Sequence, residues 1–135
     1  MIYLLDTNVC IGYLNGRAMG VLQRLQSLHP EDVGVCSVTK AELFYGARRS
    51  RNPEQTLAKQ KLFLDQFLSL PFDDQAAEQY GEIRAELAKA GTPIGPNDLL
   101  IAAIALAHNV ILVTHNTREF NRVSNLRLED WEAAF

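Results

Sequence analysis

The sequence has little cysteine, no excess of basic residues and no long apolar run. Its two cysteines, Cys10 and Cys36, match no spacing of metal ligands, and we expect both to be buried free thiols. No stretch approaches the ~18 apolar residues of a membrane-spanning helix. Because Met1 leads directly into an apolar segment and no targeting segment is visible, the expected compartment is the cytoplasm. These absences argue against a disulfide-rich secreted protein and against a membrane protein.

The charge balance is slightly acidic, with 16 acids, 13 bases and a net charge of −3. This balance disfavours binding to nucleic acid by bulk electrostatic attraction. It does not exclude a nuclease, because carboxylates that bind a metal count as negative only until the metal arrives. The 135 residues and the hydrophobic fraction of 47% indicate one globular domain over residues 1–135.

Strand and helix patterns alternate along the whole chain. Strands are expected at about 2–5, 33–36, 70–72, 110–114 and 126–128. Helices are expected at about 8–13, 17–28, 39–49, 53–68, 74–90 and 98–108, with one further turn at 117–120. This alternation predicts an α/β fold with a mainly parallel sheet that is covered by helices.

The two most apolar strands are Ile2–Leu5 and Val110–Val113. Runs of this kind are typical of parallel strands that are buried on both faces, and we expect these two to be neighbours. Functional groups of such sheets lie at the carboxyl ends of the strands. Asp6 stands at the end of the first strand and Thr114 at the end of the other, so both are expected at one edge.

Two further acids are expected to point toward the same edge, since Glu42 and Asp98 each lie in the first turn of a predicted helix. Each acid also has a purely structural interpretation. Asp6 can cap the helix after it, Glu42 can complete a capping box with Thr39, and Asp98 can interact with the dipole of its own helix. Taken singly, each acid leaves both interpretations open.

Together the three acids favour a metal centre. Each is flanked by apolar residues that draw it toward the interior, and buried carboxylates repel one another unless a cation joins them. A cluster of hard oxygen ligands suits Mg²⁺, with Mn²⁺ as an alternative. The chemistry indicated is metal-assisted hydrolysis of a phosphodiester bond.

Four segments carry a family resemblance: IYLLDTN, TKAELFYGA, PIGPNDLLIAA and LVTHNTREF. In this order and spacing they resemble PIN-domain ribonucleases, and more narrowly the VapC toxins of type II toxin–antitoxin systems. The resemblance covers essentially the whole chain. It implies an α/β/α sandwich and a Mg²⁺-dependent endoribonuclease. It also implies catalytic roles for Asp6, Glu42 and Asp98, with Asp6 and Asp98 as the metal ligands.

The chain departs from this family pattern at Asn116, where many PIN domains carry a fourth acid. Glu119 is the nearest carboxylate and is expected to take the fourth catalytic position, although it can also be a solvated charge. Asn8, Thr114 and Asn116 are candidate supporting residues that would hydrogen-bond the acids. Thr114 and Asn116 can equally be ordinary turn residues.

The resemblance also implies partners. These are a cognate antitoxin, a second copy of the chain in a homodimer, a toxin–antitoxin hetero-oligomer, and an RNA substrate, with cleavage of initiator tRNA in its anticodon region favoured. The antitoxin is expected in a groove between the helices at 39–49 and 52–68, where Phe44, Tyr45, Leu62 and Phe63 are surplus apolar residues. The dense basic stretch at 48–51 can contact phosphate or simply favour a helix C-terminus.

Two other functions fit less well. A haloacid-dehalogenase-like phosphatase needs a second Asp two positions after the first, where this chain has Asn8. A receiver-like signalling domain needs an acid pair after the first strand and a Lys after the last buried one. Here Asp6 stands alone and His115 follows Thr114.

Overall fold

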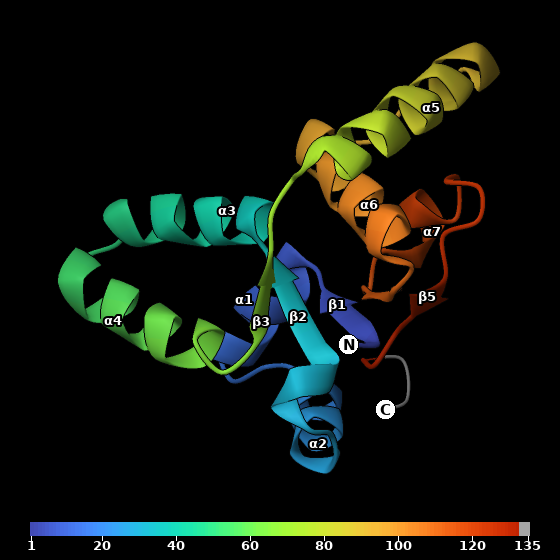
Figure 1. Cartoon of the computed structure of the whole chain (residues 1–135). Coiled ribbons are helices and arrows are strands. Elements are labelled where there is room, and N and C mark those ends of the chain that lie inside the picture. Colours follow the sequence, from blue (N-terminus) through green and yellow to red (C-terminus); the bar gives the residue numbers. More distant parts are fainter. Residues whose placement is uncertain (133–135) are drawn as a thin grey trace.

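Five parallel strands form the centre of the molecule in this computed structural model, which describes residues 1–132 (Figure 1). Their order is β3-β2-β1-β4-β5, so the first strand lies in the middle. The bounds are β1 Tyr3–Leu5, β2 Val33–Cys36, β3 Leu68–Leu70, β4 Ile111–Val113 and β5 Leu128–Glu129. Every neighbouring pair is parallel, and β1 pairs with both β2 and β4. The predicted pairing of the two most apolar strands is therefore confirmed.

Helices cover both faces of this sheet. They are α1 Thr7–Leu14, α2 Met19–Ser27, α3 Ser37–Arg48, α4 Pro53–Leu64, α5 Asp74–Ala90, α6 Pro96–His108 and α7 Thr117–Phe120, with a short 3-10 helix at Pro30–Asp32. Figure 1 shows α3 and α4 side by side on one flank, while α5 extends from the body along α6. Among the described residues, no helix is long and apolar enough to cross a membrane.

Successive strand residues point to opposite faces and divide the core into two clusters. Leu4 packs in one cluster with α5 and α6, whereas Leu5 packs in the other with α1, α2, α3 and α4. Leu112 and Val113 divide in the same way on β4. The result is a three-layer α/β/α sandwich, as predicted. Cys10 and Cys36 are buried free thiols, also as predicted, and burial raises the pKa of each.

Capping groups set both ends of α5. Asp73 caps α5, since its Oδ1 accepts the Ala76 N–H at 2.9 Å. Gly91 ends the same helix with φ of 72°, a left-handed conformation that glycine adopts without a steric penalty.

Other boundaries differ from the prediction. The helix α4 ends at Leu64, and the strand after it is 68–70 instead of 70–72. Because Pro71 has no N–H to donate to the ladder, the strand ends before it. The helix α6 starts at Pro96, two residues before the expected start at 98, with Gly95 as its N-cap. Proline is favoured at this first helical position because its φ is already helical.

Candidate active site and metal centre

Parallel pairing brings the ends of β1 and β4 to one edge of the sheet. The Asp6 N–H donates to the Val113 carbonyl at 3.1 Å, which fixes the backbone at the start of the site. Asp6 is only 3% exposed, and Thr114 is fully buried beside it. The predicted neighbours at this edge are therefore neighbours in the structure.

Asp6 is both a helix cap and a buried acid. Its Oδ1 accepts the Val9 N–H at 2.8 Å and so caps α1. Burial raises the pKa of Asp6 to about 6, although hydrogen bonds from the Thr114 hydroxyl and the Val9 N–H oppose this rise. The charges of Glu132 and Glu42 raise it further. The structural interpretation of Asp6 thus holds together with the functional one.

Glu42 is held by a hydroxyl group and not by a capping box. The helix α3 begins at Ser37, so Glu42 lies in its second turn and Thr39 lies inside it. The Thr7 hydroxyl donates to Glu42 Oε1 at 2.6 Å. Thr39 is fully buried and faces Thr7. The predicted capping box is wrong because the chain turns helical two residues earlier than the Thr39 pattern indicated.

Asp98 and Glu119 contact each other directly. Burial, a hydrogen bond to Glu119 and the negative charge of Glu119 raise the pKa of Asp98 to about 7. Burial also acts to raise the pKa of Glu119, but hydrogen bonds from the Gly95 N–H, Asp98 and Asn116 lower it overall. The Gly95 N–H to Glu119 Oε1 distance is 2.8 Å. Below about pH 7 a proton therefore lies on Asp98, which donates it to Glu119.

The structure brings all four predicted acids together. The charges of Asp6, Glu42 and Glu119 each act on Asp98, and the charge of Glu42 also acts on Asp6. A site with several carboxylate oxygens and a shared proton fits a hard divalent cation, because the cation can take the place of the proton. The metal-binding role of these acids stays a prediction, since the structure shows only that their charges interact.

Two of the three supporting candidates, Thr114 and Asn116, contact the acids, and the third, Asn8, is exposed. Thr114 contacts Asp6, and the Asn116 side-chain amide donates to Glu119 Oε2, so both touch the cluster. Asn8 lies in α1 with an exposed side chain. The Asn116 amide therefore orients the Glu119 carboxylate from the N-cap position of α7.

Sequence reasoning missed Thr7 and the two acids that follow β5, Asp130 and Glu132. His115, Asp130 and Glu132 offer ligand atoms within 4.8 Å of one another, and Glu132 acts electrostatically on Asp6. The strand β5 lies beside β4 and ends at Glu129, so the residues after it reach the same edge. The last strand was predicted at 126–128 but lies at Leu128–Glu129. The prediction therefore did not place Asp130 and Glu132 next to the strand end.

Comparisons with known proteins agree with this fold. A family model described as "PIN domain" matches residues 3–126. The chain is 44% identical over 129 residues to the "tRNA(fMet)-specific endonuclease VapC" of Shigella flexneri, covering 96% of this chain and 97% of that protein. It is 41% identical over 133 residues to "Ribonuclease VapC2" of Rickettsia felis, covering 98% of this chain and 99% of the relative.

A solved structure is similar over nearly the same extent. The DNA-bound VapBC structure from Salmonella typhimurium includes a chain with a TM-score of 0.92 and 40% identity to this one. The match covers 97% of this chain and 98% of that chain. The relatives therefore share the fold from end to end and not merely one motif.

Proposed function

We propose that this chain, which belongs to the PIN-domain family and to the VapC group within it, is the toxic endoribonuclease of a type II toxin–antitoxin pair. The assignment to the VapC group rests on the identity of the chain to curated VapC proteins over nearly its full length. The chain would hydrolyse phosphodiester bonds of RNA. The observation that carries the proposal is the meeting of four carboxylates at one sheet edge, where each of the other three acts on Asp98. Residues 1–135 would act as one nuclease domain.

PIN-domain nucleases generally depend on a divalent metal, and we propose Mg²⁺ here, with Mn²⁺ as a substitute. Asp6 and Asp98 would hold the cation, and Glu42 and Glu119 would complete the catalytic set. When bound, the ion supplies an activated water molecule and neutralises charge on the scissile phosphate. Thr114 holds Asp6, while the Gly95 N–H and the Asn116 amide orient Glu119.

The substrate follows from two of the relatives, which are named as endonucleases specific for tRNA(fMet). We propose that this chain cuts initiator tRNA in its anticodon region and acts in the cytoplasm, where that RNA is found. The test is incubation with total RNA and Mg²⁺, followed by mapping of the new 5′ ends. New ends should concentrate in the anticodon region of initiator tRNA, and a chelator should abolish them.

Two variants make this test specific. Asp6→Asn removes a proposed metal ligand, whereas Asp65→Asn changes an exposed Asp at the end of α4 and serves as the matched control. Cleavage should vanish with the first variant and persist with the second. Unchanged cleavage by Asp6→Asn would show that the metal site is wrongly assigned, and cuts mainly in other RNAs would overturn the tRNA assignment.

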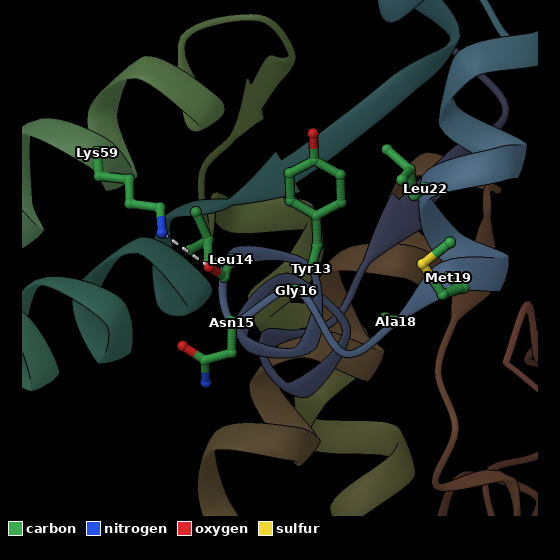
Figure 2. Close-up of a pocket in the computed structure, with 8 residues that line it drawn as sticks. All are labelled: Tyr13, Leu14, Asn15, Gly16, Ala18, Met19, Leu22 and Lys59. Atoms are coloured by element: carbon green, nitrogen blue, oxygen red, sulfur yellow. Dashed lines mark hydrogen bonds between the residues drawn. The ribbon is translucent and has the colours of Figure 1, made fainter.

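The partner would be a cognate antitoxin seated between α1, α3 and α4. A cavity of about 640 Å³ lies there, lined by residues that include Ile11, Leu43 and Gln60. A neighbouring cavity of about 630 Å³ shares Leu14, Asn15 and Lys59 with it, and Figure 2 shows Tyr13 and Met19 around this second hollow. An apolar segment from the antitoxin would fit this surface.

Apolar residues of the groove helices divide between surface and core. Tyr45 is 64% exposed and Leu62 is 77% exposed. Phe63 is buried and stacks on Tyr13 with ring centroids 4.5 Å apart, so its predicted role as a surplus groove residue is wrong. Phe44 is half-buried against the same core. Tyr45 and Leu62 are thus free to contact an antitoxin or a second copy.

The test of this surface uses the chain co-expressed with the antitoxin encoded beside it. Leu62→Ala should weaken toxin–antitoxin association and leave the unfolding temperature unchanged. Leu68→Ala, at an exposed leucine of β3 that lies outside helices α3 and α4, is the control and should alter neither. Equal association of both variants with the antitoxin would show that Leu62 is not part of the proposed interface. Sedimentation would then measure whether Leu62→Ala changes homodimer formation.

A further inference from the structure

A row of buried groups leads from β2 to Glu42. The Cys36 Sγ lies 3.6 Å from the Thr39 hydroxyl oxygen, which lies 3.1 Å from the Thr7 hydroxyl oxygen. The Thr7 hydroxyl reaches Glu42 Oε1 at 2.6 Å. Cys36 and Thr39 are fully buried, and Thr7 is buried as well. The row therefore ends on a catalytic carboxylate and begins in the core.

Counting protons gives the row a direction. A hydroxyl group has one proton to donate, and a carboxylate can only accept. Because the Thr7 proton is committed to Glu42 at the shortest contact, Thr7 accepts the proton of Thr39. Thr39 in turn accepts from the Cys36 thiol. Every donor in the row thus points toward Glu42, and hydrogen bonds to a charged acceptor are the stronger kind.

The row joins two parts of the chain that meet only in the fold. Thr7 begins α1 directly after Asp6, and Thr39 lies in α3 one turn before Glu42. Linking these helices at the hydroxyl groups fixes the Glu42 side chain relative to Asp6, on which its charge acts. Thr39 does not touch Glu42 in this arrangement, and its influence passes through Thr7.

We propose that Thr7 and Thr39 are positioning residues for the nuclease reaction, with Thr7 holding Glu42 and Thr39 fixing the direction of the Thr7 proton. This inference rests on the proposed nuclease function. Threonine is suited to the role because its branched side chain packs in the core while the hydroxyl reaches across. Serine keeps the hydroxyl, and valine keeps the shape without it.

The experiment compares Thr7→Val, Thr7→Ser, Thr39→Val and Thr39→Ser by kcat and KM for RNA cleavage at saturating Mg²⁺. The matched control is Thr56→Val, which removes a hydroxyl of α4 that is hydrogen-bonded to Ser50. Thr7→Val should lower kcat roughly 10- to 100-fold with little change in KM. Thr39→Val should have a smaller effect, and each serine variant should restore most of the rate.

A double variant separates positioning from general destabilisation. If Thr7 acts through Glu42, adding Thr7→Val to Glu42→Gln should lower the rate no further than Glu42→Gln alone. Independent multiplication of the two effects would overturn the proposal. So would wild-type kcat for Thr7→Val. An equal loss in the serine variants would show that the hydroxyl groups are not what matters.

Mn²⁺ binding gives a readout that does not depend on cleavage. Thr7→Val should weaken Mn²⁺ binding roughly 10-fold in calorimetry, while Thr56→Val should match the wild-type chain. Absence of RNA cleavage by the wild-type chain would count against the proposed function, and the Mn²⁺ series would then decide the positioning role alone. Unchanged Mn²⁺ affinity together with unchanged cleavage would reject that role.

Discussion

The two halves of the carboxylate cluster are held in different ways. Asp6 and Glu42 are anchored by neutral donors, namely the Val9 N–H and the hydroxyl groups of Thr114 and Thr7. Asp98 and Glu119 are anchored partly by each other, through a shared proton. The first half is held by these hydrogen bonds in the structure without a cation. The second half stores repulsion that a proton or a cation must relieve.

This difference suggests how the site is divided in function. A preorganised half gives the cation a fixed place to bind, which avoids reorganisation during reaction. The half that shares a proton makes binding compete with protonation near neutral pH. On the β1 side neutral donors hold both acids, whereas on the α6 side the two acids hydrogen-bond each other, so protonation there competes most directly with a cation.

The largest expected effect comes from breaking the anchored half. Asp6→Asn should lower kcat for RNA cleavage on the order of 10³-fold, because it removes a charge from the buried centre of the cluster. Rates should be measured at saturating Mg²⁺ so that weakened metal binding does not mask the result. The central place of Asp6 would be contradicted if a variant of Glu42, Asp98 or Glu119 lowered kcat more than Asp6→Asn does.

A smaller effect is expected in the half that shares a proton. Glu119→Gln should lower cleavage roughly 10- to 100-fold and weaken the response to Mg²⁺. The matched control is Glu78→Gln, which alters an exposed Glu on α5 and should leave both unchanged. Wild-type Mg²⁺ dependence in Glu119→Gln would return Glu119 to the role of a solvated charge.

Stability without metal should also distinguish the anchored acid. The folded-state pKa of Asp6 is about 6, above its ordinary value of 3.8, so the folded chain binds this proton more tightly than the unfolded chain. Stability from Asp6 is therefore greatest in acid and is lost as pH rises through about 6. The difference between these two pKa values corresponds to about 3 kcal/mol in the free energy of unfolding.

The measurement is denaturant unfolding of the wild-type chain and Asp6→Asn in a chelator. Relative to the wild-type chain, the variant should gain about 3 kcal/mol between about pH 4 and about pH 8, since Asn does not titrate. Saturating Mg²⁺ should reduce this gain by binding the ionised wild-type site. A difference between the two chains that does not vary with pH would mean that Asp6 is not strained by burial.

The smallest expected effect concerns Asn116, which orients Glu119 from the family's fourth acid position. Asn116→Ala should lower cleavage only several-fold, because the Gly95 N–H still holds Glu119. Asn116→Asp should instead raise the pKa of its neighbours and sharpen the dependence on Mg²⁺. Equal behaviour of the two variants would show that the amide has no part in the site.

Much of the fold could be predicted from apolar runs and start and stop signals. The central β1–β4 pair, the bounds of α5 and the family assignment are all confirmed. The placement of Asp6 beside Thr114 followed from the rule that parallel strands present their carboxyl ends at the same edge, whereas Glu42, Asp98 and Glu119 lie on helices. The catalytic roles of these acids remain predictions that the variants above would test.

The errors share a physical cause, since local patterns were given more weight than tertiary contacts. Thr39 and Glu42 match a capping box in sequence, but burial directs Thr39 to Thr7, 32 residues away. Phe63 matched a surface groove, yet it fills the space beside Tyr13. Contacts of this kind are set by the packing of helices and leave no short sequence signal.

The double role of Asp6 has a genetic consequence. Asparagine accepts hydrogen bonds at a helix N-terminus as well as aspartate does, so Asp6→Asn should silence the nuclease and still fold with its α1–α3–α4 groove intact. Under the proposed pairing, such a chain would still occupy antitoxin and leave less to restrain active copies. We therefore expect a cell that carries both alleles to be poisoned more readily than one in which the second copy is deleted.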